Sequence, residues 1–306
     1  MEKSLLFDKN SHEEYYKDLW NPKYELGLFF SALHEINIPI YIDFFLKGLN
    51  INQWYKTHHA LHDGFSALLK LNDELKLDFD IHEMKIRPPK NKIKAVINAL
   101  RSKPSVEHKL KGQSPYTSST DGEHFVFEAK RSIKTFEVLN GVAKIITSSL
   151  TSNTRSRWMI PTRISEKKGL QASYFGIEVD KDDSAEKTKK KFKHKLISEE
   201  HWGFYFLAKL ALKFGRSGVV KGTKKTIAQS QTLWLGSLSN LGNLGKSKMI
   251  DEMIILHPVR WHRPIGFIMY EFNARQFVTL KIHDSLLKNN NIEKLISEID
   301  EYIRAL

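Results

Sequence analysis

The chain of 306 residues is 41% hydrophobic and 27% charged, so it is long and apolar enough to bury a sizeable core. It contains no cysteine, which excludes disulfides, a thiolate nucleophile and a cysteine-ligated zinc site. No stretch approaches the roughly 18 apolar residues of a transmembrane helix, and the acidic start does not resemble a signal peptide. We therefore expect a cytoplasmic protein.

A formal net charge of +13 indicates an anionic partner. Part of this charge is local, in a lysine-rich stretch that contains Lys187, Lys189, Lys190, Lys191, Lys193 and Lys195. A solvated helix face is one interpretation of this stretch. Functional alternatives are a landing surface for an acidic carrier protein, for a nucleotide-bearing thioester, or for anionic lipid headgroups. Nucleic acid is disfavoured, because no recognised binding motif accompanies the charge.

Short helices and strands are mixed in the first part of the chain. The expected elements are a helix over residues 11–20, strands over 25–33, 39–46 and 53–58, and helices from residue 64 onward and over 91–100. The strand runs are rich in Ile, Phe, Tyr and Trp. The polar stretch 103–122, rich in Ser, Thr, Gly and Pro, is the best candidate for a linker or mobile loop.

The second part of the chain continues the mixture. We expect strands over residues 124–131, 157–164, 171–179, 233–242, 251–259, 266–272 and 276–284, and helices over 133–150, within 183–213 (two) and over 291–306. Because strands and helices do not alternate strictly, the pattern predicts an α/β or α+β fold with a large mixed sheet. The expected organisation is an N-terminal lobe (1–105), a linker (106–122) and a C-terminal lobe (123–306).

The most informative segment is His58-His59-Ala60-Leu61-His62-Asp63-Gly64, an HHxxxDG motif at a predicted strand-to-helix junction. Its candidate catalytic residues are His58, His59, Asp63 and Gly64. A strand-end histidine can act as a general base if a backbone carbonyl holds its other ring nitrogen. Asp63 stands where a helix N-cap belongs, and Gly64 lets a substrate or a neighbouring backbone come close.

Two other interpretations of the motif stay open. His58 and His62, like His59 and Asp63, have the i, i+4 spacing that can ligate zinc on a helix. However, the predicted helix begins only at Asp63, so His58 and His59 would point to opposite faces of a strand. The histidines could also be purely structural. The histidines outside the motif, such as His257, are expected to be surface residues or core residues without a functional role.

These residues resemble the HHxxxDG acyltransferase superfamily, which includes chloramphenicol acetyltransferase and the condensation domains of nonribosomal peptide synthetases. Residues 39–64 are most similar to the bacterial wax ester synthase/diacylglycerol acyltransferase family. Asn140 matches that family's Asn-Asp helix, Arg163 its PVSxR strand, and Ser239-Asn240 its Ser-Asn strand. The resemblance implies a chloramphenicol-acetyltransferase-like mixed sheet flanked by helices. It also implies two lobes, of which the first is abbreviated, since the motif begins at residue 58.

The resemblance implies an acyltransferase that moves an acyl group from acyl-coenzyme A or a carrier-bound thioester to a hydroxyl or amine. His59 is the expected base, and Ser239, Asn240 and Asn140 are the candidates for binding the oxyanion or the substrate. Asp63 is expected to form a structural ion pair with Arg163. No metal and no permanently bound cofactor are expected; the thioester is a co-substrate, and a small alcohol or amine is the acceptor.

Two departures from the family pattern motivate alternatives. Gly141 follows Asn140 where the family has Asp, and the first lobe is short, so the chain could bind an acyl carrier or an acylated ligand without catalysis. A homo-oligomer could supply a missing wall of the site. A third hypothesis places the same chemistry at an anionic membrane surface.

Overall fold

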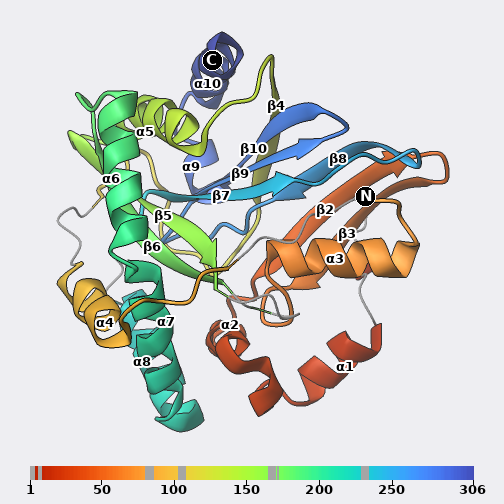
Figure 1. The fold of residues 1–306 in the computed structure, drawn as a ribbon, viewed down its shortest axis with the longest axis vertical. Coiled ribbons are helices and arrows are strands. Elements are labelled where there is room, and N and C mark those ends of the chain that lie inside the picture. Colours follow the sequence, from red (N-terminus) through yellow and green to blue (C-terminus); the bar gives the residue numbers. More distant parts are fainter. Residues whose placement is uncertain are drawn as a thin grey trace.

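The computed structural model describes residues 4–5, 9–79, 86–102, 108–164, 170, 172–228 and 234–306. Their strands form two sheets, one of four strands in the order β1-β3-β2-β8 and one of six in the order β4-β10-β9-β7-β5-β6 (Figure 1). Helices cover both sheets, so the mixed α/β fold class predicted from the sequence is confirmed. No described helix is long and apolar enough to cross a membrane.

The four-stranded sheet consists of β1 (Ser4–Leu5), β3 (Ile51–His58), β2 (Tyr41–Gly48) and β8 (Ile250–Leu256). β2 and β3 form an antiparallel hairpin in which Tyr41 lies opposite His58. α3 (Gly64–Leu75) packs on this sheet and buries Leu68 and Leu71 together with Phe44 of β2. The helix predicted from residue 64 onward thus buries one apolar face against this sheet.

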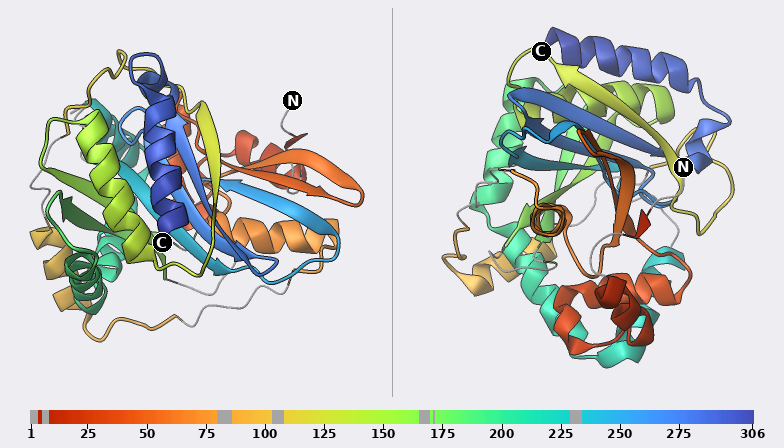
Figure 2. Two further views of the ribbon diagram at one scale, coloured as in Figure 1. Left: turned by 90° about the horizontal axis from the view of Figure 1, so that it is seen from above. Right: turned by 90° about the vertical axis from the view of Figure 1, so that its right-hand side faces the viewer.

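The six-stranded sheet consists of β4 (Gly122–Ala129), β10 (Arg275–His283), β9 (Ile265–Phe272), β7 (Gly236–Asn243), β5 (Arg155–Arg163) and β6 (Ala172–Asp180). α5 (Thr135–Leu150) and α10 (Ile292–Ala305) lie side by side on one face of it (Figure 2). Leu139 of α5 and Ile299 of α10 are fully buried there with Trp158 and Phe267. This is the largest apolar core among the described residues.

The remaining helices are α1 (Lys9–Lys17), α2 (Leu28–Glu35), α4 (Lys92–Arg101), α6 (Ala185–Ile197), α7 (Glu200–Leu212), α8 (Gly215–Ala228) and the short α9 (Asp284–Leu287). α4 packs against α7, and α2 packs against α8. α1 and α2 lie below α3 in Figure 1. The helix at α8 was not among the predicted elements.

The strand predicted over residues 25–33 is wrong. This segment contains the end of a 3₁₀ helix (Pro22–Gly27) and most of α2. Its content of Phe and Leu suits a strand, but one helical face buries Ala32, which packs with Val219 and Val220 of α8. Contact with a helix far along the chain thus overrides the local strand preference.

The predicted lobe boundary stays a prediction, but two observations bear on it. β8 comes from the second half of the chain and completes the four-stranded sheet of the first half. The described part of the expected linker, residues 108–121, contains no helix or strand and is tied to the second half. Lys111 bonds to the Leu150 carbonyl, and the Gln113 side chain bonds to the Trp261 carbonyl.

Candidate functional site

The HHxxxDG motif occupies the predicted strand-to-helix junction. β3 ends at His58, and α3 begins at Gly64. Asp63 caps the helix reciprocally: its carboxylate accepts from the Ser66 backbone N–H at 2.8 Å, and its own N–H donates to the Ser66 hydroxyl at 3.0 Å. The His59 N–H donates to the Ile40 carbonyl at 2.8 Å. The loop that carries His59 is therefore fixed at both ends.

The His59 ring has the orientation expected of a base. Its Nδ1 lies 2.9 Å from the His62 carbonyl oxygen, and because a carbonyl only accepts, Nδ1 carries the proton. Nε2 is thereby left with a free lone pair. The ring stacks on Phe30, with centroids 4.2 Å apart. Burial lowers the pKa of His59, and its hydrogen bond to His62 and the charge of Asp63 partly oppose this. A neutral imidazole results at neutral pH.

His59 lines a cavity of about 90 Å³ between the two sheets. Residues of α3, β5 and β7 and the residues that follow β8 form its walls. The structure brings six of the residues singled out from the sequence to this cavity: His59, Asp63, Gly64, Arg163, Ser239 and Asn240. They come from three separate parts of the chain. The two other candidates, His58 and Asn140, are not among the described residues that line it.

A second histidine, His257, also lines the cavity. Its Nδ1 lies 3.0 Å from the Pro258 carbonyl oxygen and 3.2 Å from the Ser237 hydroxyl, so this ring too keeps Nε2 unprotonated. Burial, with the charge of Arg263 second, holds the pKa of His257 well below its ordinary value. An added Cβ at Gly266 would lie 2.8 Å from the His257 Cβ, so this packing requires glycine.

Sequence reasoning missed His257. Its only signal was its place directly after the buried strand β8 and before a proline. No local pattern showed that β8 joins the first sheet, and this pairing is what places the end of β8 at the cavity.

Asp63 and Arg163 line the same cavity, as the predicted ion pair requires. The Arg163 guanidinium lies over the Phe65 ring, 4.4 Å from its centroid. Asp63 is almost fully buried and has a definite second role in the capping box. The ion pair itself stays a prediction.

The other predicted site residues differ in whether their side chains already have hydrogen-bond partners within the protein. The Asn240 amide nitrogen donates to Thr135 at 2.7 Å, and its oxygen accepts from the Gly242 N–H at 2.8 Å, so this side chain is already engaged. Ser239 makes no hydrogen bond through its hydroxyl within the described structure. At Gly64 an added Cβ would meet only Leu241, at an ordinary 3.4 Å. The protein itself therefore does not require glycine at position 64.

His58 faces a different environment. It is fully buried, and its Nδ1 accepts from the Ala60 N–H at 3.1 Å. Its Nε2 lies 3.1 Å from His34 Nδ1 and 3.4 Å from the Tyr15 hydroxyl. Burial and the neighbouring histidines hold the pKa of His58 well below its usual value. These contacts support a structural role for the first histidine of the motif.

Asn140 is likewise engaged away from the cavity lining. Its amide nitrogen donates to the Asp183 carbonyl at 3.0 Å and to the Thr188 hydroxyl at 2.8 Å, which ties α5 to the start of α6. The departure at Gly141 has a steric reason: an added Cβ would lie 2.0 Å from ring atoms of Tyr302 in α10. The Tyr302 hydroxyl donates to the Glu137 carbonyl at 2.8 Å. A side chain at position 141 would displace this ring.

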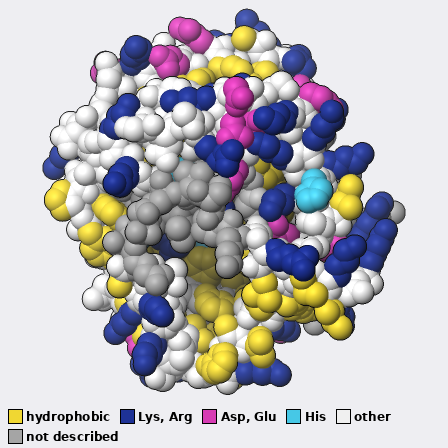
Figure 3. Space-filling view, turned by 90° about the vertical axis from the view of Figure 1, so that its left-hand side faces the viewer, with side chains coloured by type: hydrophobic (Ala, Val, Ile, Leu, Met, Phe, Trp, Pro, Cys, Tyr) yellow, Lys and Arg dark blue, Asp and Glu magenta, His cyan; other side chains and the backbone are white. Residues whose placement is uncertain are grey.

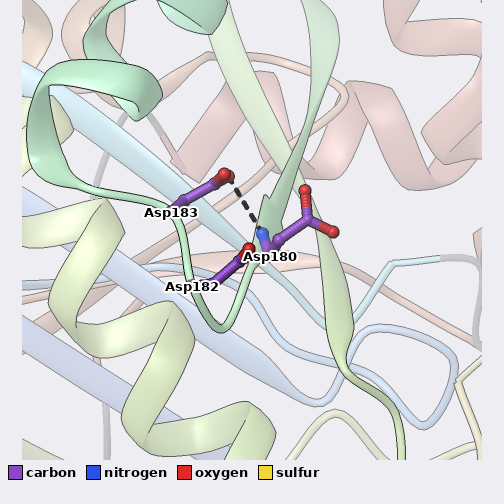
Figure 4. A group of neighbouring side chains, drawn as sticks. All are labelled: Asp180, Asp182 and Asp183. Atoms are coloured by element: carbon purple, nitrogen blue, oxygen red, sulfur yellow. Dashed lines mark hydrogen bonds between the residues drawn. The ribbon is translucent and has the colours of Figure 1, made fainter.

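Within the described residues, one acidic group has metal-binding spacing, and it does not include the motif histidines. Asp180, Asp182 and Asp183 offer oxygens within 4.8 Å of one another. Figure 4 shows the Asp183 carboxylate accepting from the Asp180 backbone N–H, at 3.0 Å. Lys187 contacts Asp183 at 2.7 Å, and Lys191 contacts Asp180 at 3.0 Å. Two of the three carboxylates, those of Asp180 and Asp183, are therefore already engaged by lysines.

No known family profile and no curated protein matches the sequence. Solved structures do match. A variant of the starter condensation domain of rhizomide synthetase has a TM-score of 0.55 at 7% identity, covering 94% of this chain and 96% of that one. The cyclization-docking bidomain of EpoB from Sorangium cellulosum has a TM-score of 0.50 at 10% identity, covering 81% and 58%.

The wax ester synthase/diacylglycerol acyltransferase from Marinobacter aquaeolei VT8 has a TM-score of 0.48 at 12% identity, covering 89% of this chain and 74% of that one. The chain spans less than two thirds of the EpoB bidomain, at 58% of its length. Identities this low describe the fold alone. The resemblance inferred from HHxxxDG is thus confirmed at the level of the fold: this chain has the fold of a condensation domain.

Proposed function

We propose that this chain is an acyltransferase in which His59 is the general base. The observation that carries the proposal is the orientation of the His59 ring: its Nδ1–H donates to the His62 carbonyl, at 2.9 Å, and the residue lines a cavity between two sheets. A neutral imidazole with a free Nε2 can accept a proton from a hydroxyl or amine. The depressed pKa of His59 keeps this form populated at neutral pH.

The proposed reaction is direct transfer. His59 Nε2 takes the proton of the acceptor as its oxygen or nitrogen attacks the thioester carbonyl. The tetrahedral intermediate then expels the thiolate, which recovers that proton from the imidazolium. A covalent acyl-enzyme is disfavoured because the chain has no cysteine and no GxSxG elbow.

The oxyanion of this intermediate needs a donor already in place. Ser239 is the best candidate, because the residue lines the cavity and its hydroxyl makes no hydrogen bond within the described structure. Asn240 is less suitable, since Thr135 and Gly242 already engage its amide. His257 does not donate through Nε2 in its present tautomer. It is instead an alternative base.

The donor in this proposal is acyl-coenzyme A or an acyl group on an acidic carrier protein, and the acceptor is a small alcohol or amine. The net charge of +13 supports an anionic donor. The non-catalytic alternative loses one of its motives, because Tyr302 explains Gly141 sterically and Asn140 serves the packing of α5 on α6. A cytoplasmic location and oligomerisation remain part of the proposal and need their own measurements.

A thiol-release assay tests this function. Wild type and His59→Ala are each given a panel of acyl-coenzyme A thioesters with mixed alcohols and amines. Because a positioned base contributes about 10²–10⁴-fold, we expect the rate to fall by that factor in His59→Ala. The matched control is His62→Ala, which keeps the backbone carbonyl that orients His59. It should retain most of the activity.

Equal rates in wild type and His59→Ala would contradict the proposal. Thioester binding by wild type without any thiol release across the panel would favour the non-catalytic alternative. Salt-sensitive binding to anionic vesicles, measured alongside, would place the same chemistry at a membrane surface.

A further inference from the structure

A second cavity, of about 390 Å³, lies among α4, β5, β6 and α6. Its size falls within the roughly 300–1,000 Å³ of small-ligand sites. Two carboxylates, Glu178 and Asp180, line it with six cationic side chains: Arg101, Arg155, Arg157, Lys187, Lys191 and Lys195. Lys and Arg side chains are spread over the face of the molecule that carries α4 and α6 (Figure 3). Positive charges therefore outnumber negative ones in the lining of this cavity.

Four of these cations already have acidic partners. Lys195 contacts the buried Glu200 at 2.6 Å, and the other ion pairs are Lys187–Asp183, Lys191–Asp180 and Arg155–Asp180. The three lysines are spaced i, i+4, i+8 and so share one face of α6. The lysine-rich stretch is thus divided, with one face turned to the cavity and the rest, including Lys193, exposed.

Arg157 differs from these four. Its side chain is 4% exposed, lines the cavity and makes no ion pair within the described structure. Its one hydrogen bond runs from Nη2 to the Ser102 carbonyl, at 3.3 Å. Burial lowers its pKa, which Glu178 and Glu200 oppose from a distance. A buried guanidinium without a carboxylate in contact is costly, so its unused donors call for an anion.

The guanidinium of Arg157 is also held in place. Its central carbon lies 4.3 Å from the centroid of the Trp234 ring. Gly176 lies against both side chains: an added Cβ there would lie 2.9 Å from the Trp234 ring and 3.0 Å from Nε and Nη2 of Arg157. Arg157 is thus packed against the indole and beside a glycine that leaves room for it, which lowers the entropy lost on binding a ligand.

We propose that this cavity binds a phosphate group, with Arg157 as its anchoring residue. The planar fork of an arginine donates two parallel N–H bonds to a phosphate, which suits this group better than a single lysine does. Arg101, at the end of α4, is exposed, has no ion pair within the described structure, and supplies a second cation on the wall. The site does not depend on the chemistry at His59.

The phosphate has two possible sources. β5 joins the two cavities, because Arg157 lines one and Arg163 lines the other. Arg157 and Arg163 are six positions apart along the strand, which is about 20 Å at about 3.3 Å per residue. A thioester donor with a phosphate about that far from its carbonyl could therefore engage both cavities. A separate phosphorylated ligand would occupy the second cavity alone.

Titration calorimetry with inorganic phosphate tests the site on the full chain, in about 0.15 M salt to screen diffuse attraction. We expect saturable binding by wild type, at least tenfold weaker binding by Arg157→Gln, and severalfold weaker binding by Arg101→Gln. The matched control is Lys193→Gln, which removes the same charge from an exposed position on α6 and should bind as wild type does. Arg101→Gln, an exposed change, keeps the test valid if Arg157→Gln fails to fold.

Absence of saturable binding would overturn the proposal, as would wild-type affinity in both arginine variants or an equal loss in Lys193→Gln. Competition then identifies the source. Displacement of phosphate by coenzyme A but not by pantetheine, which has no phosphate, would support a donor phosphate. Phosphate binding that coenzyme A leaves unchanged would support a separate ligand. Neither result depends on whether thioester turnover is observed.

Discussion

The two adjacent histidines of the motif occupy opposite environments. His58, the last residue of β3, is fully buried and exchanges hydrogen bonds with Ala60 and His34. His59, one residue later, lines the cavity between the sheets and donates to the His62 carbonyl. The change from strand to turn separates them. His58 is thus held in a network of hydrogen bonds, whereas His59 keeps a lone pair on Nε2 that can accept a proton.

This comparison shows how an imidazole becomes available for chemistry. Burial lowers the pKa of both rings, so both are neutral at pH 7. What differs is the fate of the second ring nitrogen. In His58 both nitrogens have partners within the protein, whereas in His59 the backbone engages only Nδ1.

The largest expected effect on stability is acid sensitivity. His58, His108 and His257 have pKa values lowered by burial, that of His108 to about 4. The unfolded chain therefore binds more protons below pH 6.5, and stability falls as the pH falls. His108 alone should lower the free energy of unfolding by about 2 kcal/mol between pH 6.5 and 5.

Urea unfolding at several pH values measures this loss. His58→Phe, which removes one of these groups, should show a shallower pH dependence than wild type. A free energy of unfolding that is constant from pH 7 to 5 would contradict the assignment of these buried rings as neutral.

The two histidines should differ in how much each contributes to stability. His58→Ala should lower the free energy of unfolding by about 2–4 kcal/mol, because it leaves a cavity and unpaired groups at Ala60 and His34. His59→Ala should change it by much less, since its side chain is only partly buried. Thermal and urea melts of the two variants would show this difference, and equal losses would mean that both histidines are structural.

Replacing Asp63 should have the smallest effect on the free energy of unfolding. Two different replacements distinguish its role as a helix cap from its role in an ion pair. Asp63→Asn keeps an oxygen for the Ser66 N–H, whereas Asp63→Ala removes the cap, so alanine should cost about 1 kcal/mol more than asparagine. If the ion pair with Arg163 dominates instead, both variants should lose about 3–5 kcal/mol. Unfolding in urea distinguishes the two results.

The sequence was most informative where local pattern and tertiary role agree. The strand before His58, the helix after Asp63 and the cap itself follow from short-range spacing, and the structure has all three. It was misleading at residues 28–33, where Phe and Leu favoured a strand but packing on α8 favours a helix. His257 and Arg157 were missed because their environments arise from contacts between distant segments.

The central claim is that His59 transfers the proton during acyl transfer. Chemical rescue tests it most directly: thiol release by His59→Ala is measured with and without imidazole in solution. We predict that the variant alone is slower than wild type by about 10²–10⁴-fold and that its activity rises with imidazole concentration, while His58→Ala gains nothing from imidazole. Full activity of His59→Ala without imidazole would contradict the claim.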